Sequence, residues 1–566
     1  MKMRGKLALV GLVLTASISC GRDGGDDVAG DSGVGDSGAG VDTDSDTNVD
    51  SGSNDDGGPG LPKERPPTTV KQTIVGVLPF SAQKVQNRSE WGLFEFGPGE
   101  PHIALDGLRV GESAETPTGE PTSIAYFWHV TDSQIVDEES PARLINGEVV
   151  SQSAYRNQES WSVHFLEATI RTGNDLARFR AFDFAVLTGD MIDNIQRNEQ
   201  EWFIRIMEGE LVNPDSGDDD DPIPGEGNDQ HDSFMAEGFA RQIPWYTVLG
   251  NHDELIQGNF DGLSAVIVAK PTGTVVSALS AAVIPTCLDE PFFGNESLTP
   301  KRCYMPHKSY FNKKSVVADP ERAYISRKEW IESFFGTETI PDGHGLTQDN
   351  IDSKTGYYAV DGVVPGVPSI LIVLSTVSSQ LADGTIGAPQ LDWLKEQLNT
   401  AEAAGKMVIV ASHHPLRTMA NNAQTLTNIF NDHANVVMYV NGHTHENRIH
   451  AHPAPTGQSP EYGFWEIETS AIVDWPGQTR LIEIVDNRDG TGDIYCTMLD
   501  YQVPPDMALL KGGRFYALYD LQGGGGGTEP NGAPEDRNVR LRMAWPEDVA
   551  MNLEVLPNRE IETLNF

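Results

Sequence analysis

Five short clusters of acidic, imidazole and amide side chains stand out in the sequence of 566 residues. Carboxylate oxygens, imidazole nitrogens and amide oxygens are ligands for divalent or trivalent metal ions, and one aspartate can bridge two ions through its two oxygens. The sequence therefore predicts a two-metal site if the fold brings the clusters together. In chain order they are Asp132-Ser133-Gln134, Gly189-Asp190-Met191-Ile192-Asp193-Asn194, Gly250-Asn251-His252-Asp253, Ser412-His413-His414-Pro415 and Gly442-His443-Thr444-His445.

Each cluster follows an apolar run that is typical of a buried β-strand. These runs cover residues 123–130, 184–188, 245–249, 407–411 and 436–440, and another covers 370–374. Helical spacing over 154–182 and 390–403 alternates with them, which indicates α/β layering. Ligands bind beyond the carboxyl ends of the strands in such sheets, so one crevice is expected to hold all five clusters. Runs at 463–468, 480–485 and 493–498 leave no room for helices and predict an antiparallel sheet that completes a sandwich.

The ordered motifs resemble those of the calcineurin-like metallophosphoesterases over roughly residues 123 to 500. They are Asp132-x-Gln134, Gly-Asp190-x-x-Asp193, Gly-Asn251-His252-Asp253, His413-x-Pro415 and Gly-His443-x-His445. The resemblance implies an α/β fold, a four-layer αββα sandwich of mixed sheets with a long insertion. It also implies two divalent or Fe/Zn/Mn-type metal ions. Asp190 would bridge both ions, Asp132 and His445 would hold the first, and Asn251, His413 and His443 would hold the second.

The resemblance further implies metal-dependent hydrolysis of phosphoric esters. A hydroxide bridging the two ions would attack phosphorus in a small phosphoester substrate, either a phosphomonoester or a phosphodiester. His252 would face the substrate as a general acid or charge stabiliser, and Asp253 would orient it. Asp193 and Asn194 are expected to position loops beneath the metals, and His414 to lie behind the ligands or to face substrate.

Gln134 departs from the family pattern, which has histidine at that position. Three readings stay open: Gln134 coordinates through its amide oxygen, it orients a metal-bound water, or the site has lost an ion. The third reading leads to an alternative function, a non-catalytic surface binding protein on a degenerate scaffold. His129 and His164 are nearby imidazoles, and both are expected to be packed side chains and not replacement ligands.

The first 66 residues predict an exported protein. Residues 1–20 have the basic start and apolar run of a secretory signal, and the run is too short to span a bilayer. The segment ending at Cys20 resembles a bacterial lipoprotein cleavage box, which implies lipidation of Cys20; an ordinary cleaved signal is the alternative. Residues 21–66 form an Asp/Gly/Ser-rich linker that cannot bury a core. We therefore predict a bacterial lipoprotein, periplasmic or on the cell surface, held to the membrane by a lipid anchor only.

The remaining segments are an N-terminal strand and loop region at 67–120, the metallophosphoesterase domain at 121–500 with an insertion at 254–354, and a C-terminal extension at 501–566 with a glycine-rich loop. In an oxidising compartment, Cys287 and Cys303 are expected to form a disulfide, which leaves Cys496 as a buried free thiol. The formal net charge of −43 disfavours duplex nucleic acid as a partner, because phosphate backbones bind to basic surfaces.

Overall fold

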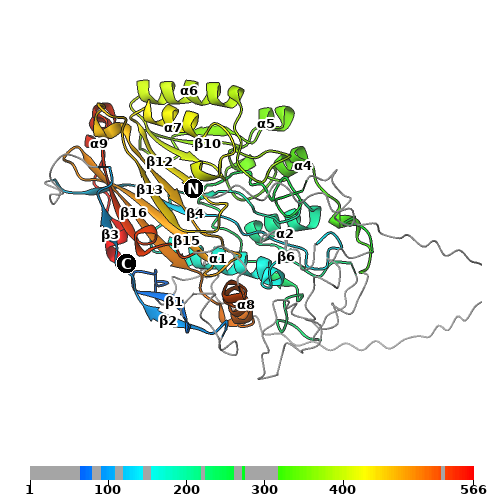
Figure 1. Ribbon diagram of the computed structural model, residues 1–566. Helices are drawn as coiled ribbons and strands as arrows, with labels where there is room; N and C mark the ends of the chain where they lie inside the picture. The colour runs from blue at the N-terminus through cyan, green and yellow to red at the C-terminus, as the bar shows by residue number, and fades with distance from the viewer. Residues whose placement is uncertain are drawn as a thin grey trace, which may run out of the picture. The chain divides into compact units, whose positions relative to one another are not determined.

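The computed structural model describes residues 64–78, 91–108, 119–143, 155–217, 224–260, 270–274, 316–523 and 530–566. The chain divides into two units, Met1–Gly60 and Leu61–Phe566, and the described residues belong to the second. That unit is built on two large mixed β-sheets with helices on their outer faces (Figure 1). No helix within the described ranges is both long and apolar enough to cross a bilayer.

The first large sheet has seven strands. Its order is β3 (Ile103–Leu105), β17 (Val539–Ala544), β16 (Thr491–Asp500), β15 (Gln478–Asp486), β4 (Thr122–Val130), β5 (Phe184–Leu187) and β8 (Trp245–Thr247). Strands β4, β5 and β8 are parallel, whereas β15 is antiparallel to both β4 and β16. The carboxyl ends of β4, β5 and β8, each followed by a predicted cluster, therefore lie at one edge of the sheet.

The second large sheet has six strands. Its order is β13 (Arg448–His452), β14 (Phe464–Glu468), β12 (Val436–Asn441), β11 (Met407–Ala411), β10 (Ser369–Val373) and β9 (Tyr358–Asp361). The four central strands are parallel, and the two edge strands are antiparallel to their neighbours. The prediction that residues 463–468 join an antiparallel sheet was wrong, because β14 pairs in parallel with β12 while the intervening β13 forms the outer edge.

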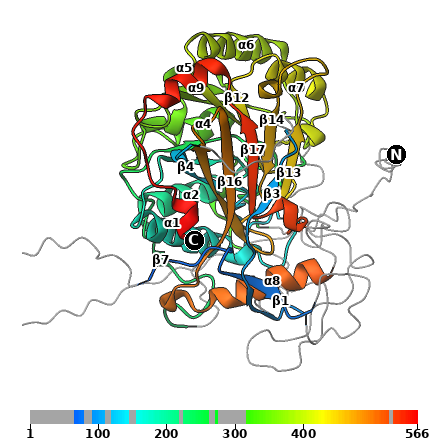
Figure 2. The same ribbon diagram turned by 90° about the vertical axis from the view of Figure 1, so that its left-hand side faces the viewer.

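The central strands are apolar on both faces because both faces are buried. In β10, Ile370 and Ile372 pack beneath the outer helices, and Leu371 and Val373 belong to the core between the sheets. Helices α6 (Ala388–Ala403) and α7 (Ala423–Asn431) cover the outer face of the six-stranded sheet. Figures 1 and 2 show the two sheets between these helices and α1 and α2 on the opposite side. The predicted four-layer αββα sandwich is confirmed.

Helices α1 (Ser162–Ala177) and α2 (Arg197–Glu208) cover the seven-stranded sheet. The backbone of α1 lies so close to β4 that a Cβ atom at Gly173 would come within 2.5 Å of the Trp128 ring. Glycine at this position therefore lets the helix approach the strand that precedes the first cluster.

Smaller elements complete the described unit. Strands β1 (Gln72–Gly76) and β2 (Phe94–Pro98) form one antiparallel pair, and β6 (Leu211–Val212) and β7 (Phe234–Met235) form another. Other helices are α4 (Arg327–Glu332), α5 (Gln348–Ser353), α8 (Leu510–Gly523) and α9 (Glu547–Glu554). Short 3₁₀ segments are Glu159–Trp161, Pro320–Arg322, Asp342–Gly345, Leu416–Thr418, Pro460–Tyr462, Pro505–Met507, Pro534–Asp536 and Glu562–Asn565.

The segment limits predicted from the sequence stay predictions. The seven-stranded sheet takes β3 from the 67–120 region and β17 from the 501–566 extension, so both flanking segments complete the central fold. Cys496 is a buried free thiol, as expected. Cys20, Cys287 and Cys303 lie outside the described residues, so the predicted lipidation and disulfide keep their status as predictions.

Candidate metal centre

The five clusters meet where strands of the two sheets end. Several residues in them have left-handed backbone conformations that residues other than glycine rarely adopt, with φ of 53° at Asp132, 41° at Gln134, 54° at Asp190, 74° at His443 and 58° at His445. Such conformations are costly and cluster at functional sites, where the surrounding structure enforces them. The chain therefore bends sharply after β4, β5 and β12, where these residues stand.

Two glycines of the motifs are fixed by close backbone contact. A Cβ atom at Gly250 would come within 2.1 Å of both the backbone nitrogen and a carboxylate oxygen of Asp190. A Cβ atom at Gly442 would come within 2.1 Å of Thr131 Oγ1 and 2.4 Å of Asp132 Oδ2. The glycines before Asn251 and His443 thus bring neighbouring loops together at the site.

One group of donor atoms is formed by Asp190, Asn251, His413 and His443. Asn251 Oδ1 lies 2.9 Å from His413 Nε2 and 2.9 Å from His443 Nδ1. His413 Nε2 lies 3.2 Å from Asp190 Oδ2 and 3.2 Å from His443 Nδ1. The four side chains predicted to surround the second ion are therefore brought together.

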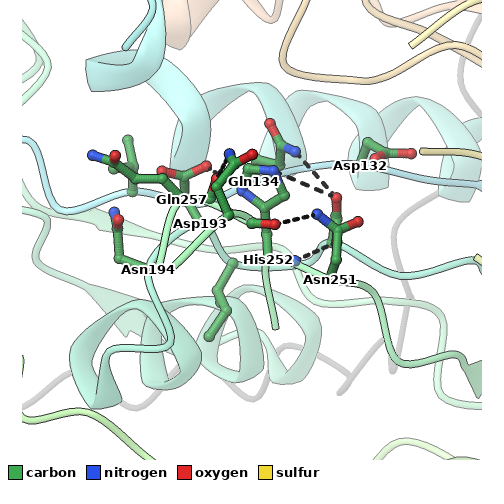
Figure 3. A network of polar contacts seen from close by, with 12 residues as sticks. Asp132, Gln134, Asp193, Asn194, Asn251, His252 and Gln257 are labelled. Carbon is green, nitrogen blue, oxygen red and sulfur yellow. Dashed lines mark hydrogen bonds and ion pairs between the residues drawn. The ribbon is translucent and has the colours of Figure 1, made fainter. Parts of the chain in front are cut away.

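A second group is formed by Asp132, Gln134, Asp190 and His445. Asp132 Oδ1 lies 3.2 Å from His445 Nε2, and Gln134 Nε2 lies 3.3 Å from both His445 Nε2 and Asp190 Oδ2. Figure 3 shows Asp132, Gln134 and Asn251 gathered around the same space as His252. Asp190 Oδ2 belongs to both groups, which is the geometry that a bridging carboxylate requires.

The donor atoms fit a pair of metal ions. Ligands held about 2.1 Å from a six-coordinate ion stand about 3 Å apart, which matches the separations of 2.9–3.3 Å measured in both groups. Asp132 Oδ1 and Gln134 Oε1 are buried and accept no hydrogen bond from the described residues. A half-turn of the Gln134 amide would exchange its oxygen and nitrogen and direct the oxygen at the other donors of its group.

Carboxylates dominate the electrostatics of this centre. Burial disfavours the charged imidazolium, but Asp190 raises the pKa of His413 to about 9, and Asp474 and Asp132 raise the pKa of His445 to about 10. Burial also opposes ionisation of Asp190, yet the neighbouring His413 and His252 hold its pKa well below the usual range. The centre thus attracts positive charge, as a cation site does.

His252 does not contact the carboxylate that the sequence prediction assigned to it. Its Nδ1 lies 2.8 Å from Asp193 Oδ1, and its backbone N–H donates to Asp190 Oδ1 at 2.8 Å. The Asp253 carboxylate instead accepts backbone N–H groups of Gly250, Asp190, Met191 and Ile192 at 2.8–3.2 Å. The expected orienting role of Asp253 was therefore wrong: Asp253 connects its own loop to the Asp190 loop, and Asp193 is the carboxylate that contacts the imidazole. Figure 3 shows Asp193 beside His252.

Asp474 orients the other side of the centre. Its Oδ2 lies 2.6 Å from His445 Nδ1, and its Oδ1 accepts a hydrogen bond from Gln158 Nε2 at 2.7 Å. Arg156, only 3% exposed, lies 3.3 Å from Asp474 Oδ1 and 3.8 Å from Asp193 Oδ1. One buried guanidinium therefore forms ion pairs with the carboxylates that orient His445 and His252.

Asn194 and His414, the other two predicted supporting residues, contact residues that surround the donor groups. The Asn194 amide donates to Glu199 at 3.1 Å and fixes its own loop. His414 is buried, with hydrogen bonds to Thr376 and to the Ala382 carbonyl, and its ring centroid lies 4.2 Å from that of His443. Burial lowers the pKa of His414 to about 3, so it supports the centre as a neutral side chain.

His129 and His164 are packed side chains, as expected. His129 is fully buried between the Thr188 and Thr469 hydroxyls, and burial lowers its pKa to about 3. His164 is buried beside the Phe234 ring, with a centroid separation of 4.8 Å.

The family assignment follows from comparison with known proteins. A family model for calcineurin-like phosphoesterases matches residues 125–447, which is more than half of the chain and includes every residue of the two donor groups. The chain belongs to the calcineurin-like phosphoesterase family. Membership implies two divalent metal ions, and the two donor groups joined by Asp190 fit that number.

Individual relatives of this phosphoesterase match over shorter stretches. A probable cyclic nucleotide phosphodiesterase from Synechococcus sp. is 42% identical over 79 residues, 12% of this chain and 30% of that protein. A manganese-dependent ADP-ribose/CDP-alcohol diphosphatase from Xenopus tropicalis is 28% identical over 114 residues, 19% of this chain and 31% of that protein. The matches thus span about a third of the length of each relative.

A solved structure also resembles the phosphoesterase. The crystal structure of a dimetal phosphatase from Danio rerio superposes with a TM-score of 0.37 and 12% identity, covering 67% of this chain and all of that chain. The family assignment rests on the match over residues 125–447 and not on this likeness.

Sequence reasoning missed the supporting residues Arg156, Gln158 and Asp474. Asp474 lies 29 positions after His445, and Arg156 lies in a loop before α1, so no spacing connects them to the motifs. The sequence offered only weak indications of these roles. Asp474 follows the last motif, and Arg156 is a basic residue between the Asp132 and Asp190 clusters.

Proposed function

We propose that this protein hydrolyses small phosphodiesters with two divalent metal ions held by the two donor groups. The observation that carries the proposal is the shared position of Asp190 Oδ2 in both groups, within 3.2–3.3 Å of His413 and Gln134. When bound, two such ions activate a water molecule as nucleophile and neutralise charge on the phosphoryl oxygens.

The chain's own residues have distinct parts in this proposal. Asp132, Gln134, Asp190 and His445 hold one ion, and Asn251, His413 and His443 join Asp190 around the other. His252 stands at the edge of the centre, with Nε2 3.9 Å from Asp190 Oδ2 and Nδ1 hydrogen bonded to Asp193. Its Nε2 is placed to donate a proton to the leaving oxygen or to stabilise charge on it.

Local charge favours a diester over a monoester. A diester carries one negative charge at neutral pH and a monoester about two. Two arginine side chains next to the site motifs are both engaged by acids: Arg156 by Asp474, and Arg417 by Glu468 at 2.9 Å and Glu446 at 3.0 Å. Neither of these two guanidinium groups is then free to neutralise the second charge of a dianion. The printed names of the two curated relatives, a phosphodiesterase and a diphosphatase, agree with this preference.

The test is a substrate and metal panel on the purified protein. Hydrolysis of bis(p-nitrophenyl) phosphate, p-nitrophenyl phosphate and a nucleoside diphosphate ester is measured with Mn, Zn, Fe and Ca, with Asp190→Ala alongside. The proposal predicts metal-dependent turnover, fastest on the diester and lost in the variant. Turnover restricted to the monoester would overturn the substrate assignment. Absence of turnover in a folded protein with fewer than two ions would instead favour the non-catalytic alternative.

We also propose that the protein is exported and anchored through a lipid on Cys20. The basic and apolar residues before Cys20 and the long polar linker after it support this proposal. Expression of the full chain in a bacterial host with labelled fatty acid should place label in the protein and the protein in the membrane fraction. The Cys20→Ser variant should lose both. Release of unlabelled wild-type protein would favour an ordinary cleaved signal. Equal label in the wild type and in Cys20→Ser would exclude Cys20 as the lipidated residue.

A further inference from the structure

A second cluster of metal-ligating side chains lies outside the centre described above. It joins the segment 137–139, which follows the Asp132-x-Gln134 motif, with residues just after β6 and just before β7. One ligand atom from each of Glu139, Asp215 and His231 lies within 4.8 Å of the other two. Glu139 is 5% exposed and His231 is 7% exposed, so most of the cluster is inside the protein.

Two buried polar atoms beside this cluster have no hydrogen-bond partner within the part of the chain that the structure describes. His231 contacts Glu138 Oε1 through Nε2, but its Nδ1 is buried and has no hydrogen-bond partner among the described residues. The adjacent Gln230 is 1% exposed, and its Oε1 is likewise buried without a donor from the described residues. An imidazole more than nine-tenths buried with an unused nitrogen is costly unless a ligand occupies it.

The cluster also holds more acidic than basic groups. Arg322 is fully buried, but its Nε lies 2.9 Å from Asp137, and its Nη2 is 3.9 Å from Glu139. Asp215 and Glu138 add two further carboxylates near His231, and a second guanidinium, Arg143, lies 3.8 Å from Glu138 Oε2. The described residues thus place four carboxylates against two guanidinium groups. Buried carboxylates in excess of guanidinium groups are expected to recruit another cation.

We propose that His231, Glu139 and Asp215 bind a third divalent ion of the zinc or manganese class. One imidazole and two carboxylates form a mixed nitrogen and oxygen set that such ions accept, whereas calcium prefers oxygen alone. The ion fastens the residues flanking β6 and β7 to the segment after Gln134. Its part is structural, because these ligands belong to neither donor group of the two-metal centre.

Metal content of the full-length protein tests this site independently of catalysis. Protein dialysed against low micromolar Zn or Mn is analysed by elemental mass spectrometry, and its unfolding temperature is measured with and without metal. We expect about three ions per chain in the wild type, one fewer in His231→Gln and in Asp215→Asn, and a smaller metal-induced rise in unfolding temperature in both variants.

Two controls separate this site from the catalytic centre. Glu226→Gln removes an exposed carboxylate nearby in the sequence and should keep about three ions. Asp190→Ala should lose ions from the two-metal centre while keeping the His231-dependent ion. His231→Gln should keep wild-type turnover at saturating Mn, which also distinguishes a failure here from a failure of the proposed hydrolysis. Equal metal content in folded wild type, His231→Gln and Asp215→Asn would overturn the third site.

Discussion

Replacement of Asp193 by Asn should slow catalysis without emptying the metal centre. Asp193 Oδ1 accepts a hydrogen bond from His252 Nδ1 at 2.8 Å, and His252 is 4% exposed. A buried hydrogen bond to a charged group contributes about 1.5–3 kcal/mol. If that energy holds His252 in its productive tautomer and orientation, its loss lowers kcat by about 10- to 150-fold.

The assay compares two diesters with leaving groups of different quality. Bis(p-nitrophenyl) phosphate has a good leaving group that needs little protonation, whereas a dialkyl or nucleoside diester has a poor one. If His252 acts as a general acid, Asp193→Asn should lower kcat more on the poor leaving group, with metal content and KM close to wild type.

Asp253→Asn serves as the contrasting variant. Its carboxylate accepts four backbone N–H groups of the Asp190 and Gly250 loops, so its loss should weaken metal binding and lower the unfolding temperature. The reasoning would be refuted if Asp193→Asn left kcat unchanged on both diesters, or if Asp253→Asn lowered kcat alone with full metal content.

Three further predictions concern metal affinity and pH. Asp474→Asn removes the carboxylate that lies 2.6 Å from His445 Nδ1 and should weaken Mn binding by about 10- to 100-fold. The measurement is the Mn concentration that gives the half-maximal rate, and kcat at saturating Mn should stay at the wild-type value. An unchanged Mn dependence would argue against the orienting role of Asp474. Gln134→Ala should raise that Mn concentration and Gln134→His should restore it, whereas equal values for all three proteins would exclude Gln134 as a ligand. Burial lowers the pKa of His344 to about 3, so below pH 6.5 the unfolded chain binds a proton that the folded one does not. Protonation of His344 in the unfolded chain should therefore lower the free energy of unfolding by about 1.4 kcal/mol between pH 7.5 and 5.5. Urea unfolding at the two pH values should show a smaller decrease in His344→Gln than in the wild type. An equal decrease in both proteins would contradict this prediction.

Much of the fold was predictable because several apolar runs end at a short polar cluster. The run 407–411 is the observed β11 without change, and 123–130 differs from β4 by one residue at its start. Strand β14 was assigned to the wrong sheet because its five residues are all buried, and burial alone does not tell which neighbour a strand pairs with. The pairing of β14 with β12 depends on how the chain returns through β13, and the sequence analysis did not predict β13 as a strand.

The close grouping of the side chains in the two donor groups was predictable because each stands in a short polar motif just after the end of a strand. The residues that orient them were not, because their partners are set in three dimensions. Asp193 and Asp253 both end short acidic motifs near His252, and in the fold Asp193 contacts the imidazole whereas Asp253 accepts backbone N–H groups such as that of Gly250. The contact of Arg156 with Asp474 joins loops more than 300 positions apart.

The most direct measurement of the central claim is recovery of diester hydrolysis after metal removal. Chelator-treated wild type and Asp190→Asn are each titrated with Mn while turnover of bis(p-nitrophenyl) phosphate and bound Mn are recorded. The account predicts that turnover returns in the wild type as Mn fills the centre, and that Asp190→Asn folds but binds fewer ions and stays inactive. Full turnover in the metal-free wild type, or in Asp190→Asn, would contradict a two-metal centre joined by Asp190.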